Sequence, residues 1–96
     1  MTTPLTLDTG HAENGTTVLT ATGEVDLSNV ADFTQALADA TSTGQVTVDL
    51  RGIAYLDSGA VNALFTYADH IRLLAPPLLM PVLIVSGLTE LVDVDG

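Results

Sequence analysis

The segment Val46–Leu50 constrains the fold more than any other part of the chain, because it alternates strictly between apolar and polar residues. Its three apolar residues would share one face of an extended strand, with Thr47 and Asp49 on the other face. A strand of this kind is buried on one side only, so it needs a second layer against its apolar face. The neighbouring sequence indicates that helices supply that layer.

Two segments on either side of this strand have the spacing of amphipathic helices. In the first, Ser28 is the expected N-cap and the helix is expected to end near Gly44. The second follows Asp57-Ser58 and is expected to end near His70. Their apolar residues recur on one stripe each: Val30, Phe33, Leu37 and Ala40 in the first, and Val61, Leu64, Phe65 and Ala68 in the second.

The remaining strands are predicted from shorter patterns. Leu5–Leu7 and Thr16–Thr22 read as a hairpin around the favoured turn pair Asn14-Gly15, and Ile71–Ala75 suits a buried strand. Val82–Val85 has the composition of a strand, although the preceding proline would also fit the first turn of a short helix. The order of elements predicts one α/β domain over residues 1–96, with helices packed on a four-stranded mixed sheet.

Charge limits the partners that the chain can bind. Twelve acidic residues stand against Arg51 and Arg72, and there is no lysine, which gives a formal net charge of −10. Nucleic acids and anionic membranes are held mainly by Lys and Arg, so we expect neither as a partner. The longest apolar stretch, Leu73–Val85, contains three prolines, and Met1–Pro4 has no features of a signal peptide. We therefore expect no insertion into a membrane and a cytoplasmic location.

The sequence also argues against an enzyme. The residues around Ser58 lack the two flanking glycines of a hydrolase nucleophile turn, and a helix of twelve residues would put His70 roughly 18 Å away. The chain has no cysteine, only one other histidine (His11), and no lysine for a phosphate-binding loop. We expect no catalytic residue, no metal and no cofactor, and we interpret Asp93–Gly96 as a solvated acidic tail.

One short motif, Asp57-Ser58-Gly59, is predicted to lie where a strand passes into a helix. Its simplest role is a helix cap, in which Asp57 or Ser58 accepts a backbone N–H bond. A serine hydroxyl at such a position is exposed, and its phosphate would carry about −1.5 to −2 charge at the positive end of the helix dipole. The motif is therefore also a candidate switch that the fold tolerates.

Several motifs together resemble the STAS domain that is shared by bacterial anti-sigma-factor antagonists and the tails of sulfate transporters. The similarity runs from about Leu5 to Val92, and its motifs occur in the order of the family. They are Gly23-Glu24-Val25-Asp26 before the first helix, Val46–Ile53 as the central strand, Tyr55-Leu56-Asp57-Ser58 as the switch loop, and the late turn Ser86-Gly87-Leu88.

The resemblance implies that Ser58 is a phosphoacceptor and that Leu78–Val85 forms a terminal helix. It also implies a partner: an anti-sigma factor, usually a serine kinase of the histidine-kinase-like ATPase fold, which the unmodified protein binds and thereby releases a sigma factor. Phosphorylation by that kinase would end the binding. The residues expected to contact the partner are Asp26, Asp57, Ser58, Gly59, Ala60 and Asn62.

The sequence departs from the family in two respects. Gly59 and Ala60 follow Ser58, where the family usually has Ser or Thr and then Gly, and the second helix is short. A second hypothesis is a STAS accessory subunit that docks on the ATPase of a membrane transporter without phosphorylation. A third, a small enzyme that uses Ser58, has the geometric difficulty described above.

Overall fold

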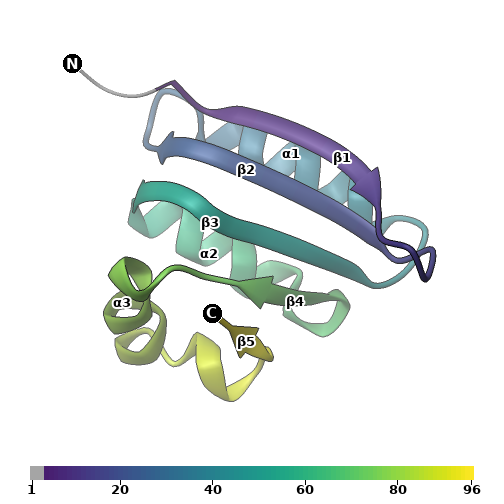
Figure 1. The fold of residues 1–96 in the computed structure, drawn as a ribbon. Helices are drawn as coiled ribbons and strands as arrows, with labels where there is room; N and C mark the ends of the chain where they lie inside the picture. Colours follow the sequence, from purple (N-terminus) through teal and green to yellow (C-terminus); the bar gives the residue numbers. More distant parts are fainter. Residues whose placement is uncertain (1–3) are drawn as a thin grey trace.

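Five strands form one sheet, in chain order, in the computed structural model, which describes residues 4–96 (Figure 1). The first two strands are antiparallel, and each later strand runs parallel to the one before it. The predicted α/β class is confirmed, with one strand more than the four expected. The strands are β1 (Thr6–His11), β2 (Thr17–Val25), β3 (Val46–Leu56), β4 (Ile71–Leu74) and β5 (Val94–Asp95).

The helices occupy the connections between parallel strands: α1 (Val30–Thr41), α2 (Ser58–Thr66) and α3 (Met80–Val85). The first two connections step in the same direction along the sheet. Because such crossovers are right-handed, α1 and α2 cover the same face, behind the sheet in Figure 1. None of the helices in the described part of the chain is long and apolar enough to cross a membrane.

Three short 3₁₀ turns complete the helical segments: η1 (Ala68–His70), η2 (Pro77–Leu79) and η3 (Leu88–Glu90). The second helix therefore ends at Thr66, earlier than the His70 expected from its apolar spacing, and its last expected turn is η1. The terminal helix implied by the family resemblance is confirmed as α3 preceded by η2.

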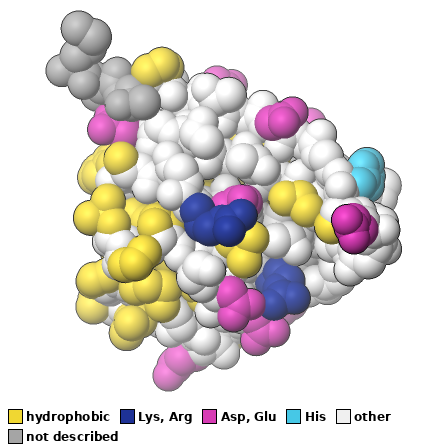
Figure 2. Space-filling model, viewed as in Figure 1, with side chains coloured by type: hydrophobic (Ala, Val, Ile, Leu, Met, Phe, Trp, Pro, Cys, Tyr) yellow, Lys and Arg dark blue, Asp and Glu magenta, His cyan; other side chains and the backbone are white. Residues whose placement is uncertain are grey.

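Most of the core lies between the sheet and the helices α1 and α2 (Figure 1). Leu19, Ala21 and Val25 of β2 are completely buried, as are Phe33 and Leu37 of α1. In β3 the three apolar residues of the first half are buried and the two polar residues between them are partly exposed, so the predicted division into faces is confirmed. The other face of the sheet is open and carries charged side chains (Figure 2).

The strand β3 continues six residues beyond Leu50, where the predicted alternation ends, and its register against β2 shifts twice. Relative to β2 it gains one residue between Asp49 and Gly52 and another between Ile53 and Tyr55. Such bulges insert an unpaired residue and change which side chains face the core. The buried positions change from every second residue to every third: Leu50, Ile53 and Leu56.

The end of the chain belongs to the sheet, so our interpretation of it as a solvated tail is wrong. The N–H of Leu73 donates to the carbonyl oxygen of Asp93 at 2.8 Å, and that of Ala75 to Asp95 at 2.7 Å. The Asp95 carboxylate also pairs with the Arg72 guanidinium at 2.7 Å. The segment Asp93–Asp95 is too short and too acidic to be recognised as a strand. It is extended because β4 needs backbone acceptors for its N–H groups.

We predict that a variant ending at Val92 is less stable by about 2–6 kcal/mol. It removes the acceptors of two backbone N–H groups of buried residues, each worth about 1–3 kcal/mol when left unpaired. The Asp95→Ala control keeps the backbone bonds and loses an exposed ion pair, worth at most about 1 kcal/mol. Urea unfolding of both variants tests this, and equal losses of stability would contradict it.

Candidate functional site

The loops that follow β2 and β3 lie side by side at one edge of the sheet. Because the two strands are parallel and adjacent, their carboxyl ends point the same way. A backbone bond joins them, in which the N–H of Asp57 donates to the carbonyl oxygen of Val25 at 3.0 Å. This pairing brings together two motifs that are far apart in the sequence, one around Asp26 and the other around Ser58.

A hollow of about 420 Å³ lies between these loops. Asp26, Asp57 and Ser58, all predicted site residues, are among the six residues that line it. The other three, Leu27, Ser28 and Tyr55, were not among the predicted partner contacts. Leu27 could have been predicted from the sequence as a contact residue, because a large apolar residue in a loop is not expected to pack in the core. In the structure it is 89% exposed.

Asp57 caps the helix that carries the candidate phosphoacceptor. Its Oδ1 accepts the backbone N–H of Ala60 at 2.9 Å, so of the two residues that could have served as the cap it is the aspartate that does so. Ser58 is the first residue of α2 and is exposed. Its hydroxyl makes no hydrogen bond to any other group between residues 4 and 96, which leaves it accessible.

The other predicted contact residues on α2, Gly59, Ala60 and Asn62, have different environments. A Cβ atom on Gly59 would come within 3.3 Å of both Asp57 Oδ1 and a methyl group of Val30, so the missing side chain allows α2 to approach the start of α1. Asn62 is exposed on α2. Ala60 is completely buried, so its inclusion among the residues that touch a partner is corrected: it packs in the core.

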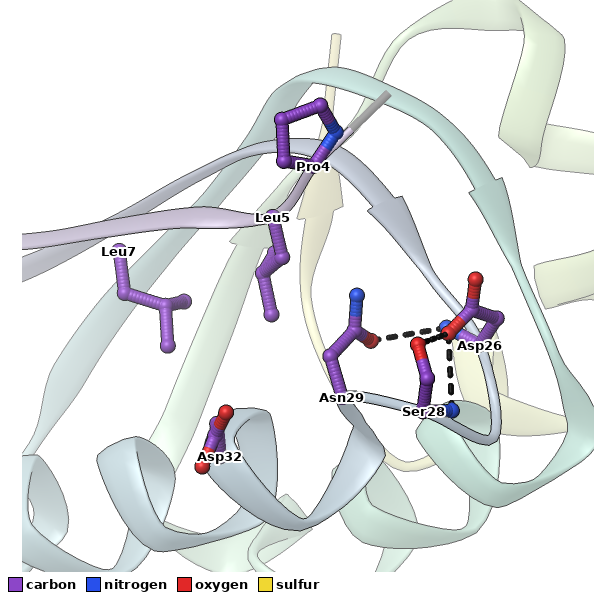
Figure 3. Close-up of a pocket in the computed structure, with 7 residues that line it drawn as sticks. All are labelled: Pro4, Leu5, Leu7, Asp26, Ser28, Asn29 and Asp32. Atoms are coloured by element: carbon purple, nitrogen blue, oxygen red, sulfur yellow. Dashed lines mark hydrogen bonds between the residues drawn. The ribbon is translucent and has the colours of Figure 1, made fainter. Parts of the chain in front are cut away.

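The turn after β2 is held by three polar side chains (Figure 3). The Asp26 carboxylate accepts both the hydroxyl and the backbone N–H of Ser28, while the Asp26 N–H donates to Asn29 Oδ1 at 2.9 Å. The Asn29 amide also donates to the carbonyl oxygen of Glu24 at 3.0 Å. The predicted role of Ser28 as N-cap is therefore wrong: its hydroxyl is used by Asp26, and Asn29 precedes the first helical residue, Val30.

The hydrogen bonds from Ser28 lower the pKa of Asp26, with a smaller contribution from the backbone of Asn29. The carboxylate is thus ionised at neutral pH and lies at the rim of two hollows. The second, of about 400 Å³, is on the other side of the same turn and is lined by the start of β1 and by Asp32 as well (Figure 3).

The hollow at Ser58 does not hold the serine–histidine pair of a hydrolase. The residues that line it include the carboxylates of Asp26 and Asp57 but no histidine. Asp49 on β3 pairs with Arg51 at 2.8 Å, and the hydrogen bonds from Arg51 lower the pKa of its carboxyl. Residues 4–96 contain no group of three acidic or histidine side chains that could hold a metal ion.

A mixed sheet covered by helices on one face, with an exposed serine on a capped helix at its carboxyl edge, is the architecture of a small domain of the STAS type. The family model described as Mlab, STAS domain matches residues 9–93. The chain belongs to the STAS domain family.

Solved structures agree with this assignment. An anti-sigma factor antagonist from Mycobacterium paratuberculosis superimposes with a TM-score of 0.87 at 17% identity, over 96% of this chain and 86% of that one. The anti-sigma factor antagonist SpoIIAA in its unphosphorylated form gives 0.74 at 18% identity, over 95% and 89%. A comparison with curated proteins gave no match. At these identities the structural likeness establishes the fold.

We predict that Asp57→Ala lowers the free energy of unfolding by about 1 kcal/mol, because the N–H of Ala60 loses its acceptor at the start of α2. Asp57→Asn keeps an oxygen at the same position and should lose less. Urea unfolding at neutral pH measures both. The cap assignment fails if the alanine variant is as stable as the wild type.

We predict that Ser28→Ala raises the pKa of Asp26 toward 3.8, its ordinary value, since the hydroxyl is the main cause of the depression. Because the folded-state pKa lies below the unfolded one, this carboxylate stabilises the fold above about pH 4, and the contribution is lost as the pH falls through the folded-state pKa. A carbon-13 NMR titration measures the shift. Ser42→Ala, whose hydroxyl binds the Asp39 carbonyl, is the control and should leave the Asp26 pKa unchanged.

Proposed function

We propose that this protein is a cytoplasmic anti-sigma-factor antagonist that is switched by phosphorylation of Ser58. Unmodified, it binds an anti-sigma factor, which is itself a serine kinase of the histidine-kinase-like ATPase fold, and so frees a sigma factor. Phosphate on Ser58 ends the binding. The observation that supports this most directly is the exposed Ser58 hydroxyl, without a hydrogen-bond partner in the described chain, at the rim of an acidic hollow.

The fold can accept a phosphate at this position. Asp57 already supplies the cap of α2, so modification of Ser58 removes no hydrogen bond that the helix needs. The phosphate would also lie at the amino end of the helix, where the helix dipole favours negative charge. The effect of modification is therefore expected at the surface and not on folding.

The same phosphate would oppose a docked partner. The hollow combines the carboxylates of Asp26 and Asp57 with the exposed apolar side chains of Leu27 and Tyr55. A partner surface that fits it is apolar at the centre and basic at the rim. A phosphate dianion held against the apolar centre of such a surface would lose its water without gaining a paired charge. That desolvation cost of a few kcal/mol corresponds to about a hundredfold loss of affinity or more.

The test is phosphorylation by candidate anti-sigma kinases with ATP, followed by peptide mapping and a binding titration. We predict phosphate on Ser58 and at least a hundredfold weaker binding of the modified protein. Ser58→Ala should stay bound when ATP is added. Ser28→Ala, a serine from the same hollow, is the matched control and should still be phosphorylated and released.

Absence of phosphate on Ser58, together with no complex, would count against the antagonist function. A second candidate is then the accessory subunit of a transporter ATPase, which the Gly59-Ala60 sequence favours because it lacks the hydroxyl residue that usually follows the phosphoacceptor serine in the family. In that case Ser58→Ala and Ser58→Glu should bind the partner with equal affinity. A large difference between these two variants would reject the accessory role.

A further inference from the structure

The segment Pro77–Val85, which forms η2 and α3, contains no polar side chain, yet most of it lies at the surface. Leu79 and Leu83, four residues apart, are its only buried residues, and Met80 is half-buried. We call the exposed remainder the α3 surface. It consists of Pro77, Leu78, Pro81, Val82, Ile84 and Val85.

The core of a single chain does not account for this composition. One stripe of a helix is enough to pack against the core, and a helix that is apolar on all sides is normally covered on all sides. Here Val85 is 88% exposed and Leu78 is 67% exposed. A contiguous apolar surface of this kind marks an interaction site in a soluble protein.

The distribution of charge indicates what covers it. The twelve acids of the chain all lie outside residues 70–89, so this stretch is free of acid in a protein of net charge −10. Figure 2 shows hydrophobic side chains gathered along the side of the molecule where α3 lies, with no charged side chain among them. Two copies of the chain would repel each other through most faces, but not through this one.

We propose that two copies of this chain associate through their α3 surfaces. An apolar surface without charge is complementary to itself, as the two-fold interface of a homodimer requires. Homodimer interfaces are also more apolar than those between different proteins, which use complementary charge for selectivity. A membrane is a poorer fit, since helices that lie on bilayers carry Lys or Arg on their polar face and this segment has neither.

The proposed dimer interface and the proposed partner site share no residue, since none of the residues that line the hollow at Ser58 belongs to the α3 surface. The dimer therefore does not depend on the antagonist function, and either proposal can fail without the other.

Sedimentation equilibrium of the purified chain tests the proposal. We expect a monomer–dimer equilibrium with a dissociation constant on the order of micromolar, because the surface is small for an interface. Raising NaCl from about 0.1 to about 1 M should strengthen the dimer, since the screening length falls from about 10 to about 3 Å and the two copies repel. An interface held by ion pairs would instead weaken with salt.

Val85→Glu should weaken the dimer at least tenfold by placing a charge in the apolar α3 surface, where Val85 is 88% exposed. Leu27→Glu is the matched control: Leu27 is equally exposed, at 89%, but lies at the hollow, so this variant should dimerise like the wild type. Circular dichroism would check that both variants are folded. A chain that stays monomeric at all concentrations and salts overturns the proposal, as does an equal effect of the two substitutions.

Two further outcomes would show that something other than a second copy covers the α3 surface, and each would overturn the dimer proposal. One is a monomer that loses affinity for the anti-sigma factor on Val85→Glu. The other is binding of the wild type, but not of Val85→Glu, to vesicles of zwitterionic phospholipid.

Discussion

The parallel pairing of β2 with β3 is the constraint on which the candidate site depends. It places the carboxyl ends of both strands at one edge, where the backbone bond from Asp57 to Val25 fixes the distance between the two loops. An antiparallel arrangement would separate Asp26 and Ser58 by the length of the sheet. The acidic hollow is thus a consequence of the sheet topology. The alternating buried residues of β2 and of the first half of β3 keep the two strands in register.

Support and exposure are divided between neighbouring residues at this edge. The Asp57 carboxylate caps the first turn of α2, so the Ser58 hydroxyl is not needed for the cap. In the other loop, Ser28 and Asn29 hold Asp26 in place, and Leu27 projects into solvent. A fold organised in this way can change the charge of one exposed side chain while its backbone stays fixed, which a partner-dependent switch requires.

The sequence predicted the parts of this structure that follow a regular period. The faces of Val46–Leu50, the stripe of α1 and the hairpin at Asn14-Gly15 were all recognisable, as was a helix cap at either Asp57 or Ser58. The second half of β3 was not, because its bulges replace a period of two with a period of three. The role of Ser28 and the strand β5 were not predicted. The Ser28 hydroxyl binds Asp26 and so does not cap α1, and β5 forms because the backbone N–H groups of β4 need acceptors. Neither effect is visible in a local sequence pattern.

The ambiguity of the segment around α3 has a physical meaning. Its β-branched and proline-rich composition fits neither an amphipathic helix nor an alternating strand, because only Leu79 and Leu83 are selected by the core. The other apolar residues must be explained by something outside the single chain. In a protein that is otherwise strongly acidic, residues 70–89 contain no acid, so hydrophobic contact through the α3 surface is not opposed by acidic charge from this segment. The features that made the segment hard to assign are therefore those that make it an interface.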